Sequence, residues 1–327
     1  MSDRLTALTR WLTDELKLEV QAVTPASADA SFRRYFRVHR PQDSLIAMDA
    51  PPDKEDCRPF VAVARAFHAV GLNVPEIFEA DLEQGFLLLG DLGERLYLDA
   101  LDADSVERLY GDALGSLATL QACGPGAERL PAYDHGLLWR EMELFRDWLL
   151  GTHLDLALGE GLRATLDETF QFLAENALEQ PQVVVHRDYH SRNLMVLPRH
   201  NPGILEVQDA VVGALTYDLV SLLRDCYIAW PREQVEDWVL GYHELALHSG
   251  VLREEDEERF LRWFDLMGVQ RHLKAAGIFA RLRHRDGKSG YLKDIPRTLG
   301  YVADVSARYA ELGELGRLLH SEVLPRL

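Results

Sequence analysis

The sequence predicts an α+β protein with two lobes, a small sheet-based N-terminal lobe over residues 1–90 and a larger, mainly helical C-terminal lobe over residues 91–327. Strand-like segments are concentrated before residue 90, and long segments with helical periodicity predominate after it. The stretch 90–93, with a glycine at each end, separates the two patterns and is the expected hinge. With 47% hydrophobic residues, a chain of 327 residues can bury a sizeable core.

The first lobe is expected to contain one small sheet and two helices. Residues 1–18 place apolar side chains at helical spacing, with acidic residues between them. The segment has no cationic start followed by an apolar block, so we expect no secretory signal. The expected strands are 31–39, 44–48, 77–80 and 85–89, and the expected second helix is 58–70.

Helical periodicity predominates in the second lobe. No apolar run reaches the ~20 residues that a membrane helix needs, so we expect no membrane partner. The three cysteines form no C-x-x-C pair, which indicates neither a disulfide framework nor a zinc site and makes the cytoplasm the expected location. The expected helices are 104–122, 135–149 and 161–178, the expected short strands are 182–185, 194–197 and 203–207, and the remainder is expected to be helical.

The charge of the chain is strongly negative and unevenly distributed. The sequence has 53 acidic and 35 basic residues, a formal net charge of −18. This balance argues against a nucleic-acid partner and against a polybasic membrane-surface protein, because both depend on Lys and Arg. Between Arg271 and Arg297, however, eight Lys or Arg stand against two Asp, which gives a local charge of +6. This basic segment needs an explanation.

The central motif is His186–Asn193, which reads H-R-D-Y-H-S-R-N and matches the pattern H-R-D-x-x-x-x-N. Phosphoryl transfer needs a carboxylate that orients or deprotonates the attacking hydroxyl, with a magnesium ligand close by. Asp188 is the candidate base and Asn193 a candidate Mg²⁺ ligand. A chance tripeptide in a turn is the alternative, and the Asn at the right offset disfavours it.

The segment after the motif carries a family resemblance. Residues 203–219 read GILEVQDAVVGALTYDL, and with the H-R-D motif they resemble the aminoglycoside phosphotransferase and choline kinase superfamily. The resemblance implies a protein-kinase-like fold, ATP and Mg²⁺. It also implies a metal-binding Asp thirteen positions after Asn193, where this chain has Glu206. Asp209 follows three residues later, and either carboxylate is a candidate metal ligand.

The same resemblance implies support for the catalytic loop and a place for the nucleotide. His186 and Asp218 are expected to support the loop, the Asp218 carboxylate by accepting backbone N–H groups. The segment 27–35 replaces the glycine-rich phosphate loop, with the Ser31 hydroxyl as an added donor. The adenine is expected against the backbone of the end of the strand before the hinge, at Leu88, Leu89, Gly90 and Asp91.

The lysine that protein kinases carry on their third strand is absent. Its slot falls near Met48, and the helical segment 58–70 offers no matching Glu. Arg33 or Arg34 is expected to supply the positive charge, since a planar guanidinium suits phosphate. Because neighbouring strand residues point to opposite faces, at most one of them reaches the phosphates.

The basic segment indicates which kind of substrate accepts the phosphoryl group. Residues 216–227 and 271–291 resemble those of the anomeric N-acetylmuramate/N-acetylglucosamine kinases of cell-wall recycling, which phosphorylate the C1 hydroxyl of the sugar with ATP. A +6 segment would repel aminoglycosides and choline, whereas an arginine can hold the lactyl carboxylate of N-acetylmuramate. A solvated helix face, balanced by the acidic run 254–258, is the alternative. The candidate sugar-binding residues are Arg271, Lys274 and Arg281, with Trp230 against the ring.

Three functions remain open on the sequence alone. The first is an anomeric amino-sugar kinase, and the second is a kinase for another small hydroxyl compound, such as an aminoglycoside or an amino alcohol. The third is a nucleotide-binding pseudokinase that acts as a partner protein, which the missing lysine and Glu206 suggest. Asp188 and Asn193 argue against the third, and no obligate protein partner is inferred.

Overall fold

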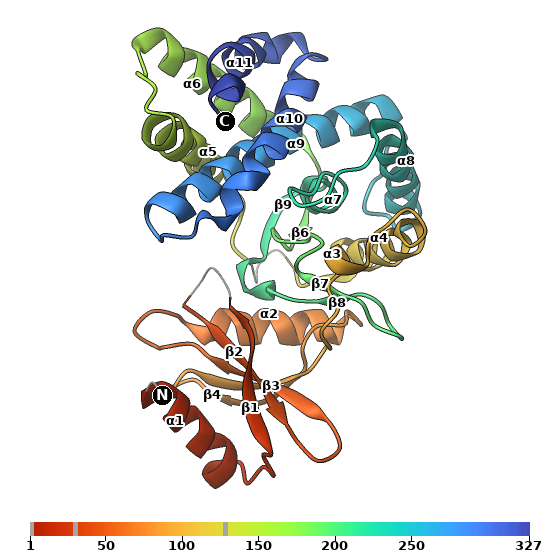
Figure 1. Ribbon diagram of the computed structural model, residues 1–327. Coiled ribbons are helices and arrows are strands. Elements are labelled where there is room, and N and C mark those ends of the chain that lie inside the picture. The colour runs from red at the N-terminus through yellow and green to blue at the C-terminus, as the bar shows by residue number, and fades with distance from the viewer. Residues whose placement is uncertain (1–2, 29–31, 127–129) are drawn as a thin grey trace. The chain divides into compact units, whose positions relative to one another are not determined.

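The chain folds into two compact units that no single cut in the sequence separates (Figure 1). The computed structural model describes residues 3–28, 32–126 and 130–327. Unit 1 consists of Met1–Leu109 and Asn193–Asp209, and unit 2 consists of Tyr110–Arg192 and Ala210–Leu327.

Unit 1 extends beyond the hinge expected at residues 90–93 and also contains the segment that follows the H-R-D motif. Leu96 forms a β-bridge with Met195, and the backbone N–H of Ile204 donates to the carbonyl of Asn73 over 2.8 Å. These backbone contacts attach residues 193–209 to unit 1. No local sequence pattern indicates them, because the partners lie far apart in the chain.

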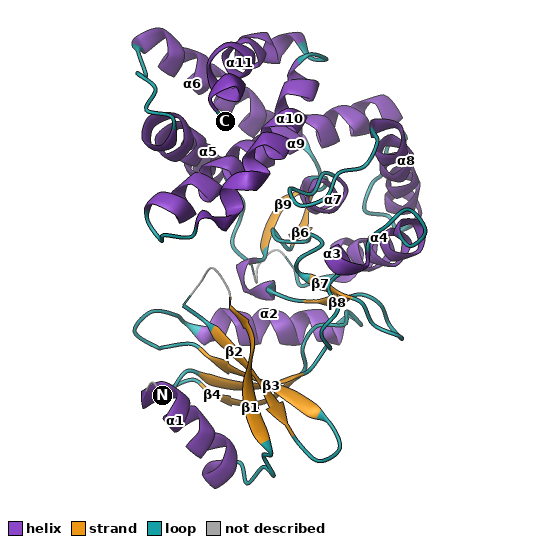
Figure 2. Ribbon diagram, viewed as in Figure 1, coloured by secondary structure: helices purple, strands orange, loops and turns teal. Residues whose placement is uncertain are grey.

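The core of unit 1 is a five-stranded antiparallel sheet covered on one side by the N-terminal helix (Figures 1 and 2). Helix α1 (Asp3–Arg10) continues as a π-helical turn, and Leu8 and Trp11 pack with Phe36 and Phe86 of the sheet. The strands are, in sheet order, β1 (Ala22–Ala28), β2 (Arg34–His39), β3 (Ser44–Asp49), β5 (Phe86–Gly90) and β4 (Ile77–Asp81).

Strand β1 is absent from the elements expected from the sequence. Its residues read AVTPASA, and small residues and a proline carry little strand preference. Pairing with β2 forms it, with Val23 opposite Val38. The tertiary partner therefore overrides the weak local signal.

The remaining elements of unit 1 are two helices and the strands of the returning segment 193–209. Helix α2 (Cys57–Ala69) begins after Asp56, whose carboxylate accepts the backbone N–H of Arg58 over 2.9 Å. It packs against the 3₁₀ turn at Val207–Asp209. The other elements are α3 (Tyr97–Ala100), β7 (Leu194–Met195) and β8 (Gly203–Ile204), the last two forming an antiparallel pair.

Unit 2 is mainly helical and is built around the long helix α9 (Glu257–His284). Across the described ranges, no helix is both long enough and apolar enough to cross a membrane. The other helices are α4 (Val106–Cys123), which begins in unit 1, α5 (His135–Leu144) with the π-helical η3 (Phe145–His153), α6 (Glu160–Glu179), α7 (Tyr217–Leu223), α8 (Arg232–His248), α10 (Ile295–Ser306) and α11 (Gly313–Leu318).

One strand of unit 2 corrects the sequence-based expectation that everything after residue 207 is helical. Strand β9 (Val211–Ala214) pairs antiparallel with β6 (Gln182–Val185), with Val211 opposite Val185. Its two β-branched valines favour a strand, but a run of four residues is too short for periodicity to reveal. This two-stranded ladder ends where the H-R-D motif begins.

Candidate active site

The loop that carries the H-R-D motif is held by two buried carboxylates. The backbone N–H groups of His186 and Arg187 donate to Asp218 Oδ2 and Oδ1 over 2.6 and 3.0 Å. The N–H of Ser191 donates to Asp225 Oδ2 over 2.9 Å. Asp218 lies in α7 and Asp225 just beyond it, so one short helix fixes both ends of the loop. The Asp218 contact is the one that the sequence suggested, and the Asp225 contact is an addition.

The Asp218 carboxyl titrates far from its usual range. Burial raises the pKa of Asp218 to about 7, although the two backbone N–H donors and the charge of Arg271 act in the opposite direction. The neighbouring charge of Asp188 raises this pKa further. The loop support is therefore electrostatically coupled to the candidate base.

Asp188 lines a hollow of unit 2 with a volume of about 100 Å³. Burial alone would raise the pKa of Asp188, but the charges of Lys274, His190, His186 and Arg271 outweigh it and lower that pKa. The carboxylate is thus ionised at neutral pH and can accept a proton. The hollow is lined by Arg187, Asp188, His190, Tyr217, Cys226, Tyr227, Arg271, Lys274, Ala275, Ile278 and Phe279.

Lys274, one of the predicted sugar-binding residues, lines the hollow but already has a carboxylate partner. Its Nζ lies 3.0 Å from Glu141 Oε1 and donates to the Tyr217 hydroxyl over 3.0 Å. Arg187 and the Tyr133 hydroxyl also contact Glu141. Burial would raise the pKa of Glu141, but Lys274 and Arg187 lower it. Glu141, which the sequence analysis missed, therefore balances the cations at the base of the hollow.

Arg271, the second predicted sugar-binding residue in the hollow, is within reach of the charges of Asp225 and Asp188 but pairs directly with neither. Its side chain is only 6% exposed, and within the described ranges it forms no ion pair. Its Nη1 contacts Cys226 Sγ at 3.7 Å, and its buried Nε has no hydrogen-bond partner. A buried guanidinium is costly unless an anion or an acceptor satisfies it. The Arg271 guanidinium therefore keeps a buried N–H group without an acceptor among the described residues.

An aromatic surface borders the same hollow. Tyr227 and Phe279 line it, and Phe279 stacks on Tyr291 with ring centroids 5.6 Å apart. The guanidinium of Arg192, in the motif loop, lies 4.8 and 5.2 Å from the ring centroids of Tyr227 and Tyr291. Aromatic faces beside polar groups suit the apolar face of a sugar ring.

The other two predicted sugar-binding residues are not among those that line the hollow. The Trp230 indole N–H donates to the Tyr110 hydroxyl over 3.0 Å, and its ring packs edge-on against Trp238. Arg281 is half-buried, and burial together with the charge of Arg285 lowers the pKa of its guanidinium. Core packing is the ordinary fate of a tryptophan such as Trp230.

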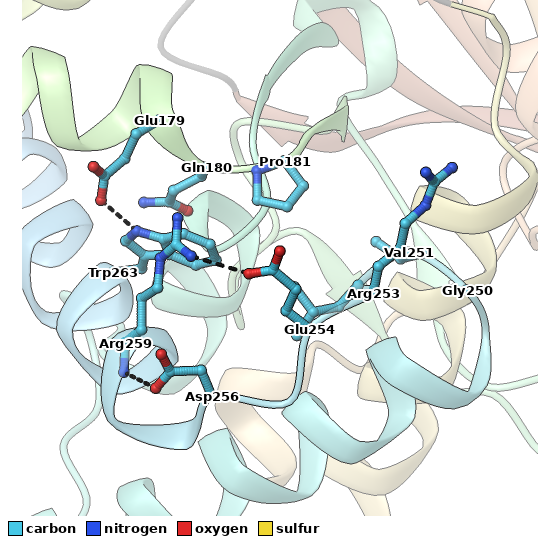
Figure 3. Close-up of a pocket in the computed structure, with 11 residues that line it drawn as sticks. Glu179, Gln180, Pro181, Gly250, Val251, Arg253, Glu254, Asp256, Arg259 and Trp263 are labelled. Atoms are coloured by element: carbon cyan, nitrogen blue, oxygen red, sulfur yellow. Dashed lines mark hydrogen bonds and ion pairs between the residues drawn. The ribbon is translucent and has the colours of Figure 1, made fainter.

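A second hollow of unit 2 lies between the end of α6 and the start of α9 (Figure 3). The Trp263 indole N–H donates to Glu179 over 2.6 Å, and Arg259 Nη1 pairs with Glu254 at 3.3 Å. Asp256 accepts the backbone N–H of Arg259 and caps α9. None of the motif residues lines this hollow.

Three of the four residues expected to bind adenine line a hollow of unit 1. Leu89, Gly90 and Asp91 line it, whereas Leu88 is buried in the sheet and does not. The Asp91 carboxylate accepts from Arg37 Nε over 2.7 Å and from the hydroxyl of Ser44 over 2.6 Å. Burial alone would raise the pKa of Asp91, and these donors lower it. The Asp91 side chain therefore already has polar partners within unit 1.

All three predicted metal ligands belong to unit 1. The N–H of Leu205 donates to the carbonyl of Asn193 over 2.9 Å, so Asn193 and Glu206 stand at the same end of the β7–β8 pair. Glu206 lines the unit 1 hollow and accepts the hydroxyl of Tyr35 over 3.1 Å, whereas Asp209 is exposed and does not line it. An amide and a carboxylate oxygen fit the donor set of Mg²⁺.

The two candidate arginines of the phosphate segment point in different directions. Arg33 Nη2 pairs with Glu55 at 3.1 Å, and Arg33 Nη1 lies 3.8 Å from Glu206 Oε2. Arg34 Nε instead donates to Asp49 over 3.0 Å. Only Arg33 therefore lies beside a predicted metal ligand. Ser31 lies outside the described residues.

Known proteins resemble this chain over most of its length. The sequence model of the phosphotransferase enzyme family matches residues 22–264. Proteins named N-acetylmuramate/N-acetylglucosamine kinase from Pseudomonas putida and Pseudomonas aeruginosa are 46% and 49% identical to it. The alignments cover 97% and 91% of this chain and 96% and 87% of those proteins.

Solved structures show the same fold at low sequence identity. The choline kinase LicA from Streptococcus pneumoniae superposes with a TM-score of 0.65 at 12% identity, over 92% of this chain and 100% of that one. The ADP-bound aminoglycoside phosphotransferase APH(2'')-Ib gives a TM-score of 0.62 at 14% identity, over 90% and 97%. The fold is that of the small-molecule kinases, and the chain belongs to the phosphotransferase enzyme family.

Proposed function

We propose that this protein transfers the γ-phosphoryl group of ATP to the anomeric C1 hydroxyl of N-acetylmuramate and N-acetylglucosamine. The observation that carries the proposal is the unit 2 hollow, which combines an ionised carboxylate, Asp188, with a buried arginine, Arg271. The names of the relatives support the same substrates. The reaction would recover peptidoglycan sugars in the cytoplasm.

The chemical roles follow from the two hollows. The nucleotide is assigned to unit 1, with its base against the backbone of Leu89–Asp91. Asn193 and Glu206 would hold Mg²⁺, with Asp209 as the alternative ligand, and the ion would offset phosphate charge when bound. Asp188 orients the C1 hydroxyl and takes its proton as the oxygen–phosphorus bond forms. The bond between the β- and γ-phosphates breaks, and ADP leaves.

The charges around the hollow favour a neutral or anionic acceptor. Lys274, Arg187 and Arg271 all line it, and Glu141 lies behind the first two. A polycationic aminoglycoside or a choline headgroup would meet positive side chains there. The lactyl carboxylate of N-acetylmuramate could instead be held by Arg271, the cation without a carboxylate partner among the described residues.

The test is an assay of free reducing ends. The enzyme is incubated with ATP, Mg²⁺ and separate samples of N-acetylmuramate, N-acetylglucosamine, kanamycin and choline. A C1 phosphate abolishes the reducing end of the sugar, whereas a phosphate at C6 leaves it. ADP release with loss of reducing ends supports the proposal. Nucleotide binding without turnover of any acceptor would instead support the pseudokinase interpretation.

Exchanging Arg271 tests how the two sugars are distinguished. Arg271→Met removes the guanidinium and keeps most of the side-chain volume. If the guanidinium holds the lactyl carboxylate, kcat/KM for N-acetylmuramate should fall ~10–100-fold, because charge-assisted hydrogen bonds are lost. The value for N-acetylglucosamine, which lacks the lactyl group, should fall much less. Equal losses for both sugars would contradict carboxylate recognition.

A further inference from the structure

We propose that Arg33 and Glu55 form the ion pair that binds the nucleotide phosphates, in place of the strand lysine and helix glutamate of protein kinases. The inference rests on the nucleotide assignment of the proposed function and adds two residues to it. In protein kinases a lysine from a sheet strand contacts the phosphates, and a glutamate of the neighbouring helix holds it. Here Met48 fills the expected lysine position and is fully buried.

Arg33 lies next to Glu206, which lines the hollow assigned to the nucleotide, although Arg33 itself is not among the lining residues. It directly precedes β2, and its side chain is 8% exposed. Its guanidinium lies between Glu55, at 3.1 Å, and Glu206, at 3.8 Å. A permanent positive charge therefore lies beside the carboxylate proposed to hold Mg²⁺, where a polyphosphate needs both.

Glu55, just before α2, is the carboxylate that pairs with Arg33. It immediately precedes Asp56, the residue that caps α2. The Arg33–Glu55 ion pair therefore connects the start of β2 to the start of α2, the helix that follows β3. Glu55 also accepts the backbone N–H of Phe32 over 3.4 Å. The Glu55 carboxylate thus holds both the backbone N–H of Phe32 and the guanidinium of Arg33. Glu55 lies three positions before residues 58–70, the segment that contains no matching glutamate.

The other arginines near this part of unit 1 are paired with other carboxylates. Arg34 binds Asp49, which is fully buried and also accepts from Arg4 Nε over 2.8 Å. Arg37 lines the hollow, but Asp91 holds its guanidinium at 2.7 Å. Among these arginines, Arg33 alone lies next to Glu206.

The test separates binding of phosphate from binding of the nucleoside. ADP and adenosine are titrated by calorimetry into the wild type and into Arg33→Met, Arg33→Lys, Glu55→Gln and Arg34→Met, with Mg²⁺ present. Arg33→Met should weaken ADP ~10–100-fold and leave adenosine within about twofold, because only the phosphates lose a charge-assisted contact. Arg33→Lys should restore part of the ADP affinity, and Glu55→Gln should weaken ADP less than Arg33→Met does.

Three results would overturn the assignment. Equal losses for ADP and adenosine in Arg33→Met would mean that the hollow itself is damaged. A loss of ADP affinity in Arg34→Met as large as in Arg33→Met would remove the distinction between the two arginines. A wild type that binds neither ligand would contradict the proposed function, and with it the assignment of this pair. Thermal midpoints of the variants, measured in parallel, show that each is folded.

Discussion

Arg271 and Lys274 lie one helical turn apart in α9 but have different partners. Lys274 is matched by Glu141 and Tyr217, whereas the side-chain hydrogen bond of Arg271 among the described residues goes to the Cys226 thiol. A buried charge with a close partner is largely compensated, and one without a close partner keeps more of its desolvation cost. The two residues should therefore affect activity differently.

Lys274→Met should shift the pH dependence of the reaction. The charge of Lys274 is the largest influence that lowers the pKa of Asp188, and burial acts in the opposite direction. Asp188 must be ionised to accept a proton, so the rate falls as the pH falls through its pKa. Removing the ammonium raises that pKa, and the acidic limb of kcat/KM should move to higher pH. The pH–rate profile measures the shift.

Arg283→Met is the matched control for this change, because Arg283 is exposed in the same helix. Its acidic limb should coincide with that of the wild type. An unchanged limb in Lys274→Met would mean that Lys274 does not act on Asp188.

Asp188→Asn should lower kcat by roughly 10²–10⁴-fold, because the amide cannot accept the hydroxyl proton. ADP affinity should remain near the wild-type value, since the nucleotide is assigned to unit 1. Turnover is measured by ADP release and affinity by calorimetry. Asp237→Asn, at an exposed carboxylate of α8, should change neither. Turnover close to the wild type in Asp188→Asn would remove the assigned role.

At the level of residues, the sequence located the motif but not its surroundings. Asp188 could be named because the spacing of H-R-D-x-x-x-x-N is local. Glu141 and Tyr35 could not, because they reach their partners Lys274 and Glu206 only through tertiary packing. The choice between Arg33 and Arg34 likewise depended on strand orientation, which composition does not contain.

At the level of elements, α9 links the cations of the hollow to the helices around it. The helix packs closely against the end of α5, and this approach requires a glycine at Gly277. A Cβ there would lie 2.2 Å from the carbonyl carbon of Leu144 and 2.5 Å from the backbone nitrogen of Phe145. Backbone atoms cannot move aside as a flexible side chain can.

Gly277→Ala should therefore destabilise the protein by roughly 3 kcal/mol, measured by urea denaturation. Gly241→Ala provides the contrast, because nothing lies within 4 Å of a Cβ at that exposed helical position. It should raise the free energy of unfolding by about 0.5–1 kcal/mol. Equal effects of the two substitutions would contradict the close packing of α9 on α5.

The elements could be predicted from the sequence where a periodic pattern extends over several turns. Helices α2 and α6 begin and end within a residue or two of the expected segments, since each presents several turns of apolar spacing. Strands β1 and β9 were not expected, the first because of Pro25 and its small residues and the second because it is only four residues long. Both are formed by their partner strands.

At the level of the whole molecule, the basic segment 271–297 has a buried part and an exposed part. Its first part, with Arg271 and Lys274, is buried in α9 and borders the candidate sugar site. Its later part, with Arg283 and Arg285, is exposed. Part of the excess positive charge therefore lines the candidate sugar site, and the rest lies on the solvent-exposed surface.

Each proposed substrate should protect its own unit from hydrogen exchange. ADP with Mg²⁺ should slow amide exchange in the sheet of unit 1, and N-acetylmuramate alone should slow it around residues 186–192 and α9 of unit 2. Exchange is followed by mass spectrometry of peptides from the intact protein. Protection of the unit 1 sheet by the sugar alone would contradict the assignment of the two hollows.

The way the chain divides between the units has a consequence for how such a protein can be rearranged. The backbone passes from one unit to the other three times, after Leu109, Arg192 and Asp209. Asp188 and Asn193 are thus five positions apart in the gene but belong to different units. A single gene fusion or truncation cannot exchange one unit and keep the other whole. Exchanging unit 2 for that of a relative therefore requires two separate segments, 110–192 and 210–327, to be replaced together.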